Sequence, residues 1–72
     1  MNGSLNIKLN SEIYDIQSVR QAMSAFQKIA CVELSFADGY YVLEFTNGKY
    51  PLMEIKDEFC NYLVDAMNKR TK

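Results

Sequence analysis

The sequence contains no histidine, only three glycines, one proline and two cysteines among its 72 residues. Without histidine, the chain offers no Ser-His-Asp or Cys-His catalytic arrangement and no histidine-ligated metal site. The glycines Gly3, Gly39 and Gly48 stand apart from one another, so the chain has no glycine-rich loop for a phosphate or a dinucleotide. We therefore expect no catalytic residues, no bound metal and no cofactor, and we do not expect an enzyme.

The chain also has no excess of one charge and no long hydrophobic run. Eight basic side chains oppose nine acidic ones, for a net charge of -1, whereas nucleic-acid binders usually carry a basic excess or a basic stripe. The longest apolar stretches, residues 29–32 and 40–43, are far too short to span a bilayer, and residues 1–10 do not read as a signal peptide. We expect no nucleic acid and no membrane partner, and a cytoplasmic protein.

A hydrophobic content of 49%, with five tyrosines and four phenylalanines, predicts a folded chain. Its length predicts a single domain, residues 1–72, with an ordered core at about residues 5–68. Cys31 and Cys60 match no zinc or redox spacing, and they could form one bridge or remain two free thiols. An intracellular setting favours free thiols.

The first half of the chain predicts a strand followed by a helix. Residues 5–9 alternate apolar and polar side chains, the period of a half-buried strand. Asp15 is a good N-cap, and Tyr14 before it can pack on Val19 as a hydrophobic staple. Apolar residues then recur at helical spacing, which predicts a helix over residues 16–29. They are Ile16, Val19, Ala22, Met23, Phe26 and Ile29.

Residues 31–46 predict a β-hairpin. Two alternating stretches flank Asp38-Gly39, a pair that favours a type I′ turn because both central residues need positive φ. This turn pairs Ala37 with Tyr40, Phe36 with Tyr41, Leu34 with Leu43, and Val32 with Phe45. The last three pairs then share one apolar face, and a slip of one residue would break that pattern.

A second helix is expected over residues 52–68. Pro51 suits its first turn, and acidic residues lie early while Lys69-Arg70 lies late, as the helix dipole favours. The core stripe of this helix is Leu52, Ile55, Phe59, Tyr62, Leu63 and Ala66. We expect Met23, Met53 and Met67 to fill the core or its margin.

The order of elements predicts an α+β domain, β-α-β-β-α. A right-handed crossover makes the first two strands parallel, and the third can insert between them, antiparallel to both. The result is a split β-α-β unit, a three-stranded sheet of order 1-3-2 with both helices on one face. The expected helix-covered face carries Leu5, Ile7, Leu9, Val32, Leu34, Phe36, Tyr41, Leu43 and Phe45.

The opposite face of the sheet is the candidate recognition surface. The hairpin register places Glu33 opposite Glu44, and we expect Lys8 to offset part of their repulsion. The pair can be an acidic spot for a basic partner or a tolerated pair on a solvated face. Tyr40 and Val42 make the face partly apolar, which suits a protein partner or self-association but also occurs on ordinary surfaces. The outer strands are sheet edges open to strand addition.

Several stretches resemble a known family. Residues 9–14 lead into the first helix in a way that is similar to the opening "Y-s-x-x-a-i-x-x-A", and residues 58–63, Glu-Phe-Cys-Asn-Tyr-Leu, are similar to the motif "E-F-x-N-x-L". Together with the two hairpin strands, the match covers about residues 5–68 and resembles the His-Xaa-Ser system protein HxsD family. Cys60 departs from it, because an aliphatic residue is commoner there. Asn61 is the polar motif residue that packing least requires.

The resemblance implies a role in bacterial systems in which radical S-adenosylmethionine (SAM) enzymes modify a peptide carrying His-Xaa-Ser repeats. The small member has no chemistry of its own, so the implied role is an accessory protein that binds the enzyme or the precursor peptide. The alternative is a small self-associating homodimer with an unrelated role. The candidate partner-binding residues are Glu33, Tyr40, Val42, Glu44 and Asn61.

Overall fold

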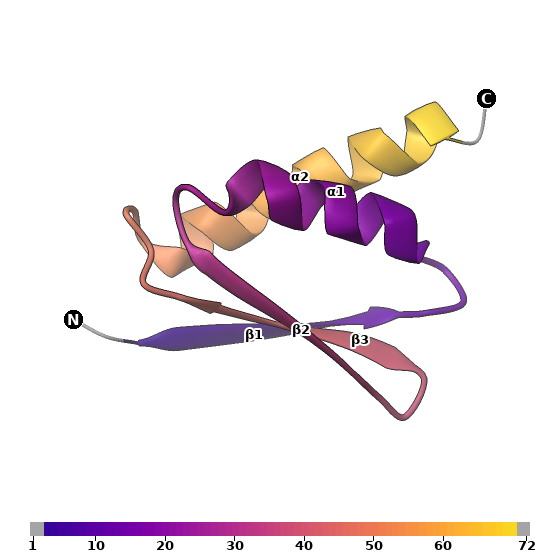
Figure 1. Ribbon diagram of the computed structural model, residues 1–72, viewed down its shortest axis with the longest axis horizontal. Helices are drawn as coiled ribbons and strands as arrows, with labels where there is room; N and C mark the ends of the chain where they lie inside the picture. The colour runs from indigo at the N-terminus through magenta and orange to yellow at the C-terminus, as the bar shows by residue number, and fades with distance from the viewer. Residues whose placement is uncertain (1–2, 71–72) are drawn as a thin grey trace.

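The computed structural model describes residues 3–70, which form one layer of strands and one layer of helices (Figure 1). The elements in chain order are β1 (Ser4–Asn10), α1 (Ile16–Phe26), β2 (Cys31–Ala37), β3 (Tyr40–Thr46) and α2 (Leu52–Arg70). Both helices lie on the same side of the sheet. The expected α+β fold is confirmed.

The sheet has the order β1-β3-β2, with β3 antiparallel to both neighbours. α1 packs over β2, whereas α2 packs over β1 and β3. The split β-α-β topology predicted from the order of elements is therefore present, and β1 and β2 are the two edges of the sheet.

The predicted hairpin register is confirmed residue by residue. Ala37 pairs with Tyr40 at the turn, and Glu33 pairs with Glu44 further along. Both turn residues adopt positive φ, 55° at Asp38 and 81° at Gly39, as a type I′ turn requires. The three apolar pairs of the register consequently face the helices.

α1 begins where the sequence predicts and ends earlier. The Asp15 side chain accepts hydrogen bonds from the backbone N–H groups of Gln17 and Ser18 at 2.9 and 3.2 Å, which confirms the N-cap. The fully buried hydroxyl of Ser18 also donates to Asp15, at 2.5 Å. The helix ends at Phe26, whose carbonyl accepts from the N–H groups of Ile29 and Ala30 in a closing turn. The expected helix of residues 16–29 was three residues too long.

The core lies between the helices and the covered face of the sheet. Phe59 of α2 is its centre, because its ring packs edge-on against Phe26 of α1 at 5.4 Å and against Phe45 of β3 at 5.1 Å. The buried cluster comprises Leu9, Val19, Ala22, Phe26, Ala30, Leu43, Phe45, Ile55, Phe59 and Leu63. Tyr14 packs against the edge of this cluster, in keeping with the expected staple.

Three residues expected in or beside the core lie outside it. Tyr62 is 38% exposed on α2, with its ring edge-on to Phe26 at the margin. Phe36 belongs to the helix-covered face by register but is 63% exposed, because the hairpin bends away from the helical layer toward its tip (Figure 1). Its ring contacts only the margin of the core, through Tyr41 at a centroid distance of 5.7 Å. Met53 is 59% exposed on α2, whereas Met23 and Met67 are half-buried against the core as expected.

Gly39→Val tests the hairpin turn. A β-carbon at Gly39 would meet nothing within 4 Å, so any destabilisation arises from the positive φ and not from a clash. A β-branched residue resists that conformation, and we expect the free energy of unfolding to fall by about 1–3 kcal/mol.

Chemical denaturation measures the effect, and Gly39→Asn is the control because asparagine tolerates positive φ. The control should lose clearly less stability than the valine variant. Equal midpoints for the valine variant and the parent would show that this turn conformation does not limit stability.

Candidate binding face of the sheet

The sheet leaves one face without helices, and we call it the open face. Because side chains alternate along a strand, each strand contributes every second residue to it. Its central members are Asn6, Lys8, Glu33, Ser35, Tyr40, Val42 and Glu44. Four of the five candidate partner-binding residues, Glu33, Tyr40, Val42 and Glu44, are therefore brought together on one surface.

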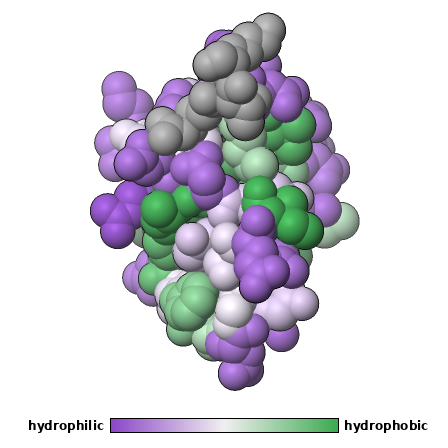
Figure 2. All heavy atoms as spheres, turned by 90° about the vertical axis from the view of Figure 1, so that its right-hand side faces the viewer, coloured by the Kyte–Doolittle hydropathy of each residue, from purple (hydrophilic) through white to green (hydrophobic). Residues whose placement is uncertain are grey.

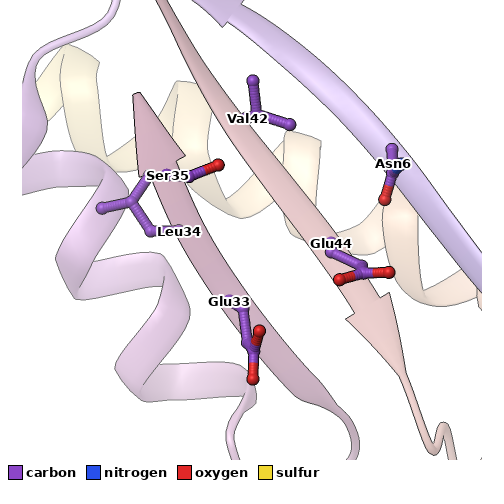
Figure 3. A pocket seen from close by; sticks show the side chains of 6 residues that line it. All are labelled: Asn6, Glu33, Leu34, Ser35, Val42 and Glu44. Carbon is purple, nitrogen blue, oxygen red and sulfur yellow. The ribbon is translucent and has the colours of Figure 1, made fainter. Parts of the chain in front are cut away.

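The two glutamates line a shallow depression of about 180 Å³ on this face. Glu33 of β2 and Glu44 of β3 lie directly opposite each other, and Asn6 of β1 lies opposite Glu44 on its other side (Figure 3). The depression is lined by Asn6, Glu33, Leu34, Ser35, Val42 and Glu44. Two carboxylates, an amide oxygen and a hydroxyl make it a surface that accepts hydrogen bonds and favours cations.

Lys8, expected to offset part of the repulsion in the glutamate pair, makes no direct ion pair with it. The β1–β3 register places Lys8 opposite Val42, and its ammonium lies over the Tyr40 ring, 5.8 Å from the ring centroid. Among the described residues, no ion pair joins Lys8 to either glutamate. The nearest basic side chain of the face is thus engaged elsewhere, in a cation–π contact between Lys8 and Tyr40.

Tyr40 and Val42 supply the apolar part of the open face. Tyr40 is 39% exposed and Val42 is half-buried in the central strand. Val42 borders the glutamate depression, and Tyr40 lies two residues before Val42, at the start of β3. The face therefore combines an acidic hollow with an adjoining apolar stretch, which suits a partner that carries both positive charge and apolar surface.

Asn61 does not belong to this surface. It is exposed on α2, in the helical layer on the other side of the sheet. Any role for Asn61 would therefore need a partner that contacts the helical layer as well as the sheet.

The two cysteines are free and lie in different layers. Cys31 is exposed at the start of β2, where its sulfur accepts a hydrogen bond from the Asn47 amide at 3.9 Å, and Cys60 is half-buried on α2. Burial raises the pKa of the Cys60 thiol, against the lowering effect of the nearby Lys56. The reactive thiolate is thereby disfavoured at Cys60, which argues against a nucleophilic role.

The sequence patterns missed an exposed apolar group at one end of the molecule. Ile13, in the connection after β1, is 66% exposed, and Phe36 lies in the hairpin that projects at the same end. Figure 2 looks onto this end and shows hydrophobic side chains on both sides of a paler central strip. Ile13 belongs to no periodic segment of the sequence, and the hairpin register assigned Phe36 to the helix-covered face of the sheet. The exposed apolar group therefore becomes visible only from how the hairpin lies relative to the helices.

A second hollow, about 170 Å³, lies at the start of α2 and is lined by Ile29, Tyr50, Glu54, Ile55 and Glu58. It is more apolar than the glutamate depression and includes none of the candidate residues. Within residues 3–70, no three acidic or cysteine side chains gather closely enough to hold a metal ion. None of the helices described is both long and apolar enough to cross a membrane.

The chain matches no protein-family model, no curated protein and no solved structure.

Glu33→Lys tests whether the glutamate pair is repulsive. The substitution replaces two like charges that face each other across β2 and β3 with an opposite-charge pair. We expect the free energy of unfolding to rise by about 0.2–1 kcal/mol at low salt, and the gain to shrink as salt screens the charges.

Urea denaturation at low and high salt measures the change, because urea carries no charge. Glu12→Lys is the matched control, since it makes the same charge change at an exposed position in the turn after β1. A gain of the same size in both variants would mean that net charge, and not the cross-strand pair, accounts for it.

Proposed function

We propose that this protein is a non-enzymatic accessory protein that binds a protein or peptide partner through the open face of its sheet. The observation that carries the proposal is the acidic depression between Glu33 and Glu44, which adjoins Tyr40 and Val42 and is left uncovered by the protein's own helices. A like-charged pair on a partly apolar face costs stability, and binding a cationic partner would recover it.

The resemblance to the HxsD family supplies the biological setting of the proposal. In that setting the protein serves a bacterial radical SAM enzyme that matures a peptide with His-Xaa-Ser repeats, and it acts in the cytoplasm. The partner is then either the enzyme or the precursor peptide. The chemistry of the face favours the peptide, because protonated histidine side chains combine positive charge with a flat ring.

The shape of the surface also supports a peptide. A sheet face with a hollow of about 180 Å³ has room for one side chain rather than for a substrate enclosed on all sides. An extended peptide can lie across the strands, place one cationic side chain between the glutamates and lay apolar atoms against Val42 and Tyr40. No step of chemistry is required of the protein itself.

The double variant Tyr40→Ser with Val42→Thr tests the face. Both side chains lie outside the buried core, so we expect the stability to change by no more than about 1 kcal/mol. Binding of the partner should weaken by more than about tenfold if the face is the recognition surface.

A pull-down of the candidate radical enzyme and titration with a synthetic His-Xaa-Ser repeat peptide are the two measurements. Tyr50→Ser is the control, since it removes an exposed tyrosine from the connection between β3 and α2, away from the open face. A double variant that folds and binds both partners as the parent does would exclude the open face as the binding site.

The pH dependence of peptide binding separates the charge contribution from the apolar one. Histidine in a flexible peptide gains its proton as the pH falls through about 6.5. The Glu33–Glu44 pair should then hold the peptide more tightly, so affinity should increase as the pH decreases through that value.

Glu33→Gln together with Glu44→Gln should flatten this pH dependence while leaving the binding near neutral pH less affected. The control peptide carries alanine in place of each histidine and should bind weakly at every pH. Affinity that stays constant across this range for the parent protein would contradict the role of the glutamate pair.

A further inference from the structure

The β1 edge of the sheet and the outer flank of α2 form an unpartnered surface distinct from the open face. Four side chains of α2, Met53, Cys60, Val64 and Met67, fall within an arc of about 60° at 3.6 residues per turn. Met53 is 59% and Val64 49% exposed, and Cys60 and Met67 are half-buried. We call these four residues the α2 strip.

The α2 strip lies on the side of α2 that faces away from α1. On the other side of the helix, Tyr62 packs edge-on against Phe26 of α1 at a centroid distance of 5.9 Å. The buried stripe with Phe59 and Leu63 separates the two flanks. Because α2 packs over β1 and β3 and α1 packs over β2, the α2 strip faces the β1 side of the sheet.

The hydrogen-bonding pattern leaves the outer edge of β1 available. Opposed residues in antiparallel strands alternate between bonded and non-bonded pairs. The Ser11 N–H donates to the Gly39 carbonyl at 3.0 Å, so these two opposed residues form a bonded pair. By the alternation along the register, the pairs that Leu9 and Ile7 form with β3 are bonded pairs as well. Odd-numbered residues of β1 therefore bond to β3, and the backbone N–H and C=O groups of Asn6 and Lys8 point away from the sheet.

The sequence of β1 is complementary to itself about Ile7. If two copies pair antiparallel with Ile7 opposite Ile7, then Leu5 faces Leu9 on the helical side and Asn6 faces Lys8 on the open side. No like charges meet, and all apolar pairs fall under the helices. Asn6 and Lys8 would then exchange the backbone hydrogen bonds that the monomer leaves unmade.

The same two-fold axis sets the two α2 helices antiparallel. Figure 1 shows the middle of α2 above the middle of β1, so an axis through Ile7 brings the centres of the two strips together. Of the charged residues in the first half of α2, Lys56 and Asp57 flank the α2 strip at 3.6 residues per turn, whereas Glu54 and Glu58 line the hollow with Ile29 on the other flank of the helix. Lys56 and Asp57 form an ion pair with each other at 2.9 Å, so the flank that meets its copy carries no net charge, and antiparallel packing opposes the dipoles of the two helices.

We propose that a second copy of this chain occupies this surface, forming a two-fold dimer in which β1 pairs with β1 of the partner and the two α2 strips pack together. The dimer has one continuous six-stranded sheet of order β2-β3-β1-β1-β3-β2. It leaves the open face free, so it stands independently of the proposed function. Apolar side chains on α2 and unbonded edge groups on β1 find partners in a single contact.

The first test follows the native protein from micromolar to millimolar concentration. Light scattering should show a change from monomer to dimer, and amide hydrogen exchange should slow at Asn6 and Lys8 over the same concentration range. A monomer throughout would overturn the proposal, and so would a dimer in which these two amides remain unprotected.

Val64→Lys is the variant that tests the α2 strip. It places a charge at an exposed position, so the monomer keeps its fold, and dimerisation should weaken at least about tenfold. Ser24→Lys makes the same charge change at an exposed position of α1 and should dimerise as the parent does. Equal dimerisation of the two variants would overturn the proposal.

The double variant Tyr40→Ser with Val42→Thr distinguishes this dimer from recognition by the open face. It should dimerise normally even where it loses partner binding. Loss of the dimer in this variant would place self-association on the open face instead and overturn the β1 contact.

Discussion

The turn at Asp38-Gly39 is the constraint on which the rest of the structure depends. Because both residues take positive φ in a two-residue turn, β2 and β3 can pair in only one register. That register sends Leu34 and Leu43 toward the helices and, by the alternation of side chains, sends Glu33 and Glu44 to the other face. The core and the acidic depression are thus two consequences of one local choice of backbone conformation.

The described elements cover only one face of the sheet. Two helices suffice to cover one side of a three-stranded sheet, and Phe59 and Leu63 use that cover to enclose Phe45 and Leu43. No further element is available among the described residues to cover the other side. A chain of this length buries a smaller share of its surface than larger domains do, so gains from association matter more to it.

The features predicted correctly from the sequence are those set by local chemistry. The hairpin register follows from the turn residues and the alternation around them, and the start of α1 follows from the capping side chain of Asp15. The end of α1 could not be read in this way, because residues 27–29 continue its helical pattern and only the geometry needed to begin β2 stops the helix at Phe26.

The features of the candidate site that the sequence did not indicate have the same non-local origin. No tight turn joins β1 to β3, so nothing in the sequence indicated that Lys8 would lie opposite Val42 and leave Glu44 to Asn6. Phe36 has the right register for burial, but it is exposed because the hairpin bends away from the helical layer toward its tip. Asn61 was singled out by a motif and lies in α2, in the helical layer where the predicted helix of residues 52–68 had placed it.

The two proposals together suit a partner built from repeats. In the six-stranded sheet of the dimer, the two glutamate depressions lie four strand spacings apart, or roughly 20 Å at 4.8 Å per spacing. An extended chain covers that distance in about six residues, which equals two His-Xaa-Ser repeats. One peptide could then place a histidine in each depression, and the second contact would be intramolecular, which raises the overall affinity without any new kind of interaction. Disrupting the dimer through the α2 strip should therefore weaken binding of a long repeat peptide much more than binding of a single repeat, because only the long peptide can use both depressions.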